Sequence, residues 1–233
     1  MNRSLRMVLV LTLMAVLAVR CTPEQPIDNG DTVDEHEYVD LGLPSGVLWA
    51  TCNVGAESPE AFGDYFAWAE TQPKAVYDWK SYRYGDFCIE RYDLTKYCTD
   101  SLYGADGFAD YKSILEPEDD AATVNWGEEW RTPTSEEWEE LMQYTSAVRT
   151  TLNDVGGWLL TADNGNAIFL PAAGYWWDDI LNAAGIGVYW SSLVNKDSPC
   201  RAWGFHFNWD QCHICGSSDR NRGQTVRAVR SAK

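Results

Sequence analysis

The chain has 233 residues, of which 45% are hydrophobic, 13% are aromatic and 23% are charged, and its formal net charge is −17. This length and composition fit one large domain or two small ones, and they exclude a disordered chain, a collagen and a coiled coil. An acidic surface repels phosphate groups, so the charge excludes nucleic acid as an expected partner and disfavours membrane binding through a basic patch.

The first 20 residues have the pattern of a secretory signal. Arg3 and Arg6 precede an almost unbroken apolar stretch, residues 7–19, which is too short to span a bilayer. No later segment is apolar enough to span one, so we expect an exported protein rather than a polytopic membrane protein. Removal of residues 1–20 takes away arginines and no acidic residue, which makes the mature chain still more acidic.

Cys21 stands where a bacterial lipoprotein signal places its lipidated cysteine. Residues 17–19 suit this interpretation, whereas Arg20 occupies a position at which a small residue is expected. Ordinary cleavage after Ala18 is the alternative. Lipidation predicts an outer-membrane lipoprotein at the cell surface that touches the membrane only through its lipid anchor. The acidic segment 21–36 is then a tether.

Cysteine usage fits export, because an even set of cysteines remains when Cys21 is set aside from the 7 in the chain. Cys88 and Cys98 are the best local pair for a disulfide, since a bridge between them would close a Tyr-rich loop. Such a bridge adds roughly 2–3 kcal/mol to the free energy of unfolding. The alternative is that some cysteines are buried free thiols that behave as small hydrophobic residues.

Short apolar runs separated by turn residues predict strands. The predicted strands are residues 47–52, 65–68, 157–161, 167–170, 188–192, 202–208 and 225–229. Asp163-Asn164-Gly165-Asn166 lies between two of these runs and is a strong hairpin signal. We therefore expect short antiparallel strands along much of the chain.

Two main helices are predicted. Residues 117–126 carry acidic residues at the positive end of the helix dipole, and Gly127 follows as a stop. Thr134 and Glu137 form a capping box ahead of an apolar face at helical spacing, which predicts a helix over residues 135–145.

Residues 75–112 are rich in Tyr, Asp and Gly, and we expect them to form an ordered, irregular insertion. Short strands, two main helices and long ordered loops together predict an α+β domain that spans residues 37–230.

A series of motifs along the chain resembles a known family. The motifs are YVDLGLPSG (38–46), GDYFAW (63–68), DDAA (119–122), FLPAAG (169–174), YWSS (189–192) and VRAVR (226–230). In number and order they resemble the Fibrobacter succinogenes major paralogous domain, a large group of exported bacterial proteins. The resemblance covers nearly all of residues 36–230 and implies a C-type-lectin-like fold. It implies little about the ligand, because fold does not determine function.

The segments NW (125–126), WRTPT (130–134) and EW (137–138) also resemble the formylglycine-generating-enzyme branch of this fold. Those enzymes oxidise a substrate cysteine with a reactive cysteine pair. Cys212 and Cys215 have a different spacing, and the expected Arg-Gly-Gly-Ser-Trp stretch is absent. A zinc site formed by this pair and His206 lacks a second cysteine pair. We therefore expect no catalytic residues, no metal and no cofactor.

Tryptophan residues divide into two groups. Those that fit strand or helix patterns are predicted to lie in the core, and they are Trp49, Trp68, Trp126, Trp138, Trp190 and Trp203. Trp176 and Trp177 follow a glycine in a predicted loop and precede Asp178 and Asp179. Adjacent exposed indoles would form a binding platform, and the alternative is a loop that folds its aromatic residues beneath itself. Trp209 is a further candidate contact.

The C-terminal segment 202–230 is the first choice for a ligand face. Framework residues alternate there with chemically arbitrary ones, which resembles the variable region of C-type-lectin-like receptors diversified by retroelements. The arbitrary positions are Gly204, His206, Asn208, Asp210, Cys212, His213, Cys215, Ser217, Ser218, Asp219 and Asn221. Strand alternation would turn Phe205 and Phe207 inward and their neighbours outward. The alternative is an ordinary, undiversified family member with a polar hairpin.

We expect, from these observations, a cell-surface binding protein that recognises a protein or glycan through its C-terminal face without a chemical step. A structural or adhesin subunit of a surface fibre is one alternative. A formylglycine-generating-enzyme-like oxidoreductase is the other.

Overall fold

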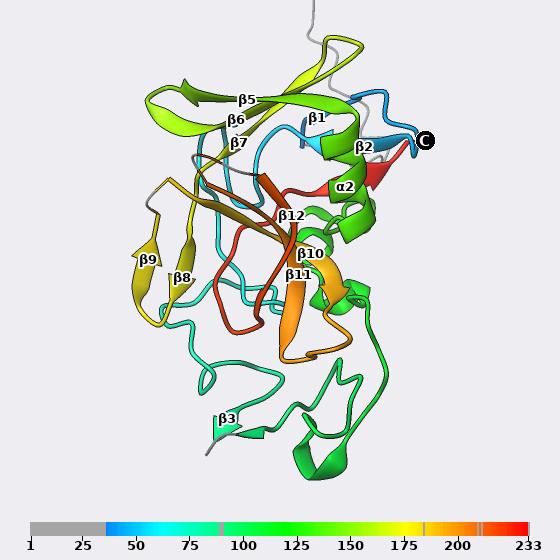
Figure 1. Ribbon diagram of the computed structural model, residues 1–233, viewed down its shortest axis with the longest axis vertical. Coiled ribbons are helices and arrows are strands. Elements are labelled where there is room, and N and C mark those ends of the chain that lie inside the picture. Colours follow the sequence, from blue (N-terminus) through cyan, green and yellow to red (C-terminus); the bar gives the residue numbers. More distant parts are fainter. Residues whose placement is uncertain (1–35, 89–90, 184, 209, 211, 233) are drawn as a thin grey trace, which may run out of the picture. The chain divides into compact units, whose positions relative to one another are not determined.

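Figure 1 shows the computed structural model of the chain, which describes residues 36–88, 91–183, 185–208, 210 and 212–232. Glu35–Lys233 form one of two compact units. The predicted signal (1–20), the candidate lipidation site Cys21 and the tether up to residue 35 lie outside the described residues.

The first antiparallel sheet pairs the two ends of this unit. Its order is β1 (Tyr38–Val39), β2 (Val47–Ala50) and β13 (Val229–Ser231). All four residues of the central strand β2 are buried. The beginning and the end of the domain thus share one sheet, and Trp49 is opposite both Val39 and Val229.

The second sheet contains β5 (Thr145–Leu152), β6 (Val155–Ala162) and β7 (Ala167–Pro171), in that order and antiparallel. The predicted hairpin around Gly165 is confirmed by the pairing of β6 with β7, and this glycine has a φ of 86°. Strand β5 was not predicted, because its sequence is mostly polar and none of its residues is buried, so no apolar pattern marks it.

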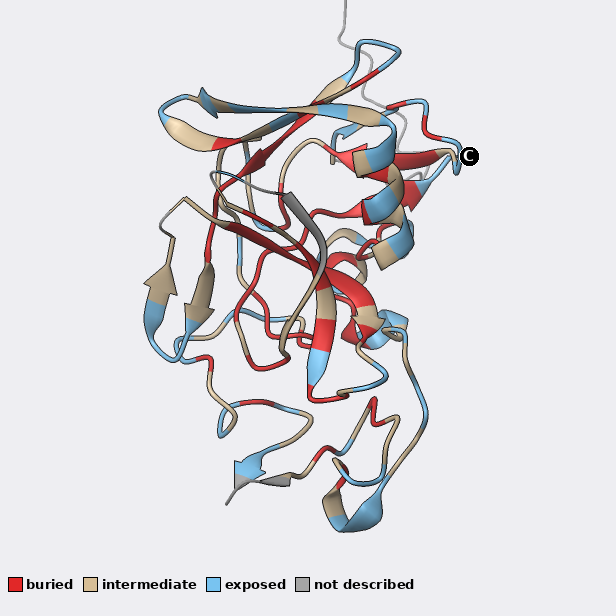
Figure 2. Ribbon diagram, viewed as in Figure 1, coloured by how far each residue is buried: buried red, intermediate tan, exposed pale blue. Residues whose placement is uncertain are grey.

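The third sheet has the order β10 (Gly187–Val194), β11 (Arg201–Phe207) and β12 (Cys212–Asp219). Both predicted strands, 188–192 and 202–208, are confirmed with small shifts at their ends. Phe205 and Phe207 are buried as the alternation predicts. Figure 2 shows that β10 and most of β11 are buried along their length, so this sheet is the central layer of the core.

Two short hairpins complete the strands of the described part of the chain. One pairs β3 (Phe87–Cys88) with β4 (Arg91–Tyr92) inside the predicted insertion, and the other pairs β8 (Tyr175–Trp177) with β9 (Ile180–Asn182). The insertion is otherwise made of turns and the short 3-10 helix η1 (Ala105–Gly107), as expected for an ordered, irregular segment.

The predicted helix 117–126 is divided into η2 (Pro117–Asp119) and α1 (Ala121–Trp126). Asp120 causes the break, because its extended backbone ends η2 while its carboxylate accepts hydrogen bonds from the amides of Ala122 at 2.9 Å and Thr132 at 2.8 Å. Burial raises the pKa of Asp120, and these hydrogen bonds oppose the rise. The stop at residue 127 is confirmed.

The second helix, α2 (Ser135–Gln143), begins with the predicted capping box of Thr134 and Glu137. It is shorter than predicted, because Thr145 already begins β5. None of the described helices is long and apolar enough to cross a membrane.

Two predicted strands are wrong in detail. Residues 65–68 form only a single bridge, between Phe66 and Gln224, and of residues 225–229 only the last belongs to β13. Both segments run through the buried interior as single bridged chains rather than as continuous ladders. Their apolar residues are explained by burial, which apolar pattern alone does not separate from strand pairing.

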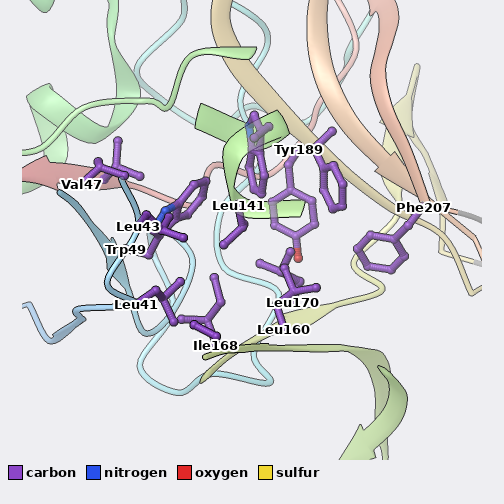
Figure 3. Close-up of a cluster of buried hydrophobic side chains, with 14 of the residues drawn as sticks. Leu41, Leu43, Val47, Trp49, Leu141, Leu160, Ile168, Leu170, Tyr189 and Phe207 are labelled. Carbon is purple, nitrogen blue, oxygen red and sulfur yellow. The ribbon is translucent and has the colours of Figure 1, made fainter. Parts of the chain in front are cut away.

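Aliphatic and aromatic side chains together fill the core between α2 and the sheets (Figure 3). Trp138 of α2 stacks on Phe205 with ring centroids 4.8 Å apart and also contacts Trp49 at 4.7 Å. Of the six tryptophans predicted to lie in the core, Trp126 and Trp203 are only half-buried. The other four are fully buried, as predicted.

Arg227 is fully buried and connects three parts of the chain. Its guanidinium donates to Asn53 Oδ1 at 2.9 Å, to the carbonyls of Ala50 and Thr51 at 3.2 and 3.0 Å, and to the carbonyl of Phe169 at 3.0 Å. Burial lowers the pKa of Arg227. These hydrogen bonds compensate the desolvated charge, because each of the four acceptor groups is a dipole oriented toward it.

A second buried guanidinium, that of Arg220, attaches the insertion to the core. It donates to the Tyr82 hydroxyl at 2.8 Å and to the carbonyls of Lys96 at 3.1 Å and Pro199 at 3.0 Å. Its central carbon also lies 5.0 Å from the ring centroid of Trp68. The insertion is therefore ordered by its contacts with the C-terminal segment rather than by its own secondary structure.

Replacement of the buried arginine tests this role. Arg227→Met leaves four acceptors without their donor, three of them buried, and we expect the free energy of unfolding to fall by about 3 kcal/mol. Denaturant unfolding followed by tryptophan fluorescence measures the change. Arg83→Met, which removes an exposed arginine, is the matched control and should change stability by less than about 1 kcal/mol. Equal stability of the two variants would contradict the role assigned to Arg227.

Candidate functional site

A cleft with a volume of about 340 Å³ is lined by residues of the β8–β9 hairpin and of the sheet β10–β11–β12. Figure 1 shows where these elements lie in the fold. The volume of the cleft is at the lower end of the roughly 300–1,000 Å³ that small-ligand sites occupy. The lining residues are Tyr175, Trp177, Ile186, Val188, Arg201, His206, Phe207, Asn208, Ser218, Asp219 and Arg222. The cleft thus combines aromatic and apolar surface with hydrogen-bonding and charged groups.

The β8–β9 hairpin forms one wall and begins at Gly174. This residue has a φ of 70°, and a Cβ atom at this position would lie 2.2 Å from the carbonyl oxygen of Asn182. Because side chains alternate along a strand, Tyr175 and Trp177 share one face and Trp176 takes the other. Trp177 is 51% exposed, whereas Trp176 is half-buried against Tyr77.

Backbone hydrogen bonds attach this hairpin to two distant segments. The amide of Trp176 donates to the carbonyl of Gly223 at 2.8 Å, and the amide of Gly223 donates back at 3.1 Å. Asp178 and Tyr77 exchange a similar pair of hydrogen bonds, at 2.8 and 3.1 Å. The position of Trp177 is therefore determined by the C-terminal segment and by the insertion together.

Strands β11 and β12 form the opposite wall. In their register Arg201 is opposite Asp219, which brings both side chains to the cleft. His206 Nε2 lies 3.5 Å from Ser218 Oγ. The His206 ring also lies against Gly216, where a Cβ atom would be 2.1 Å from Nδ1. A side chain at position 216 would displace this ring from the cleft.

Two guanidinium groups share one carboxylate in the cleft. Arg201 Nε and Arg222 Nη2 each lie 3.5 Å from an oxygen of Asp219. Arg201 also donates to the carbonyl of Ser217 at 2.8 Å. The Arg222 guanidinium lies over the Trp177 ring, 4.0 Å from its centroid. These three side chains carry an excess of one positive charge in a chain whose net charge is −17.

Five residues predicted from two separate segments come together here. Trp177 from the tryptophan pair meets His206, Asn208, Ser218 and Asp219 from the C-terminal segment. The two candidate ligand regions of the sequence therefore form one cleft, in which residues from the two regions face each other.

Other predicted contacts are corrected by the structure. Trp176 and Trp177 lie on a strand rather than in a loop, so they do not form a joint indole platform. Gly204 is buried, and a Cβ atom there would lie 2.3 Å from the carbonyl oxygen of Tyr189. Asn221 is also buried, and its side-chain amide donates to the carbonyl of Tyr77 at 3.1 Å.

The remaining predicted positions do not line the cleft or are not described. Asp178, Asp179 and Asp210 are exposed and Ser217 is half-buried, but none of them lines the cleft. Four of the predicted positions have side chains that lie outside the described residues, namely Trp209, Cys212, His213 and Cys215. Among the side chains that are described, no group of three or more His, Cys, Asp or Glu residues could hold a metal ion.

Sequence reasoning missed several lining residues. They are Tyr175, Ile186, Val188, Arg201, Phe207 and Arg222. A hairpin centred on Asp210 would have paired Arg201 with Asp219, so that contact was within reach of the sequence. The approach of Arg222 to Trp177 depends on tertiary structure alone.

Cys98 is a free thiol in the structure, so the disulfide predicted between Cys98 and Cys88 is not present. Its Sγ atom lies 3.1 Å from the carbonyl oxygen of Asp100, and burial raises the pKa of the Cys98 thiol. The side chain of Cys88 lies outside the described residues. Cys200 is likewise buried and free, which confirms the alternative that some cysteines act as small hydrophobic residues.

Comparisons with protein-family models, with curated proteins and with solved structures found no match to this chain. What the protein can bind therefore follows from the chemistry of the cleft itself. Its side chains provide ring surface, hydroxyl and amide groups and guanidinium donors, which are the groups that proteins use to bind a polar ligand.

The burial of Gly204 can be tested directly. Gly204→Ala places a methyl group against the Tyr189 carbonyl, and we expect the free energy of unfolding to fall by about 2 kcal/mol. Asp210→Ala, at an exposed position of the same segment, should change it by less than about 0.5 kcal/mol. Urea unfolding of both variants provides the comparison. A Gly204→Ala protein as stable as the parent would show that position 204 is free to vary.

Proposed function

We propose that the protein is an exported, lipid-anchored binding protein of a bacterial cell surface, and that it recognises a protein or glycan ligand through the cleft without a chemical step. The signal pattern of residues 1–20 and the position of Cys21 support export and anchoring. The order of the family-like motifs supports membership of the Fibrobacter succinogenes major paralogous domain group and a C-type-lectin-like fold. The mixed, sheet-rich architecture is compatible with that proposal.

One observation carries the proposal. Two segments that were predicted separately as ligand-binding regions line the same cleft. Trp177 lies on the β8–β9 hairpin and His206 on β11. Asn208 directly follows β11, and Ser218 and Asp219 lie on β12. Loops and hairpins on a rigid scaffold are the usual carriers of recognition. The buried sheet beneath this cleft is such a scaffold.

The buried positions in the C-terminal segment favour a fixed site over a diversified one. Gly204 and Asn221 belong to the arbitrary set, yet both are packed in the interior. Most substitutions at such buried positions destabilise a fold, so a diversification mechanism that changed these residues freely would produce unstable variants. We therefore favour an ordinary family member. A neighbouring reverse transcriptase gene with a near-copy of the codons for residues 200–230 would contradict this preference.

Removal of the exposed indole tests the proposed function. The purified protein is screened against arrayed glycans and surface proteins, and the affinity of each ligand found is compared with that of Trp177→Ala. We expect binding to weaken about thirtyfold, as for an aromatic residue at the centre of an interface.

Ile180→Ala is the matched control for this experiment. Ile180 is opposite Trp177 in the same hairpin and is exposed, but it does not line the cleft. Its replacement should leave binding unchanged. Full affinity in Trp177→Ala would place the ligand elsewhere and would contradict the proposed function.

A further inference from the structure

We propose that the cleft binds a carboxylate-bearing sugar, with the carboxylate held by Arg222 and Arg201. This inference rests on the proposed function and specifies its ligand. The charges in the cleft are unequal, because two guanidinium groups are opposed by the carboxylate of Asp219 alone among the lining residues that the structure describes.

The contacts of Asp219 leave the guanidinium donors largely unused. Both of its ion pairs have N–O distances of 3.5 Å, whereas charge-assisted hydrogen bonds are about 2.7–2.9 Å long. Arg222 makes no side-chain hydrogen bond to any residue that the structure describes, although its side chain is only 18% exposed. Polar groups with so little exposure normally have partners. A ligand anion in the cleft would provide one.

Arginine also indicates the shape of the anion. A guanidinium presents a planar pair of N–H donors that matches the two oxygens of a carboxylate. The Trp177 ring supports Arg222 from one side at 4.0 Å, which restricts the orientation of this fork. The site is therefore preorganised for a flat, two-oxygen acid group.

The other lining groups suit a sugar ring. Tyr175 and Trp177 offer ring surface to the apolar C–H face of a pyranose, and Ser218 offers a hydroxyl to its hydroxyl groups. The volume of about 340 Å³ accepts a small ligand or the end of a longer chain. A protein partner would require a much larger contact, of about 800 Å² on each side.

The charge of the whole chain limits the number of acid groups on the ligand. A net charge of −17 creates a field that repels polyanions, so a densely charged polysaccharide is disfavoured. A glycan with a single acidic sugar in an otherwise neutral chain avoids this repulsion and still engages the two arginines.

The inference is tested on a glycan array printed in pairs. Each glycan that contains a uronic or sialic acid is placed beside its carboxyl-reduced, neutral counterpart, and sulfated neutral glycans form a third group. The full chain should bind acidic members and bind their reduced partners at least tenfold more weakly, as expected for the loss of a charged hydrogen-bonding group.

Variants measured by calorimetry with a bound acidic glycan separate recognition from a structural role. Arg222→Met should weaken binding about thirtyfold. Asp219→Asn removes the competing carboxylate and should strengthen binding about fivefold, whereas a purely structural Asp219 would give weaker binding. Arg83→Met removes an exposed arginine outside the cleft and should have no effect.

The outcomes distinguish this inference from the proposed function. Ligands that are neutral, proteinaceous or bound equally after carboxyl reduction, but are still lost in Trp177→Ala, overturn the inference and leave the proposed function intact. Binding of sulfated glycans alone, or of no arrayed glycan, also overturns the inference. Ligands retained by Trp177→Ala overturn both.

Discussion

Two fully buried guanidinium groups hold the segment from Arg220 to Arg227, and the cleft depends on this segment. Both arginines donate to backbone carbonyls of segments far away in the chain. Each such hydrogen bond contributes only about 1 kcal/mol net, but a buried acceptor that loses its donor costs about 1–3 kcal/mol. The segment therefore cannot leave its place without breaking several interactions at once, which makes its position stable despite its irregular conformation.

Between these two anchors the chain carries the residues that build the binding site. Arg222 lines the cleft, and Gly223 exchanges backbone hydrogen bonds with Trp176 of the β8–β9 hairpin. Gln224 and Phe66 likewise exchange a pair of backbone hydrogen bonds, so two distant parts of the chain hold this segment in position. A guanidinium held on such a segment loses little conformational freedom when a ligand binds, and preorganisation of this kind favours affinity.

Local signals predicted the parts of the fold that local interactions determine. The capping box of α2, the hairpin around Gly165 and the inward alternation of Phe205 are all short-range patterns. Strand β5 pairs locally with β6 across the turn at Asn153 and Asp154, but it was missed because its polar sequence carries no clear apolar pattern. The course of residues 225–228 was displaced, because the contacts of this segment depend on distant partners. The site divides in the same way. Trp177 and Asp219 are recognisable as polar or aromatic residues in turn-rich segments, but the approach of Arg222 to Trp177 depends on tertiary packing.

Native-state hydrogen exchange of the Trp176, Gly223 and Gln224 amides tests most directly whether the two buried arginines lock the cleft in place. These amides donate to carbonyls across the cleft's supporting segments. If the account is correct, they exchange only through global unfolding, with the same free energy of opening as the amides of the central strand β2. If the three amides instead exchanged through local opening, with a free energy of opening much lower than that of the β2 amides, the account would be contradicted. The segment from Arg220 to Arg227 would then move independently of the core.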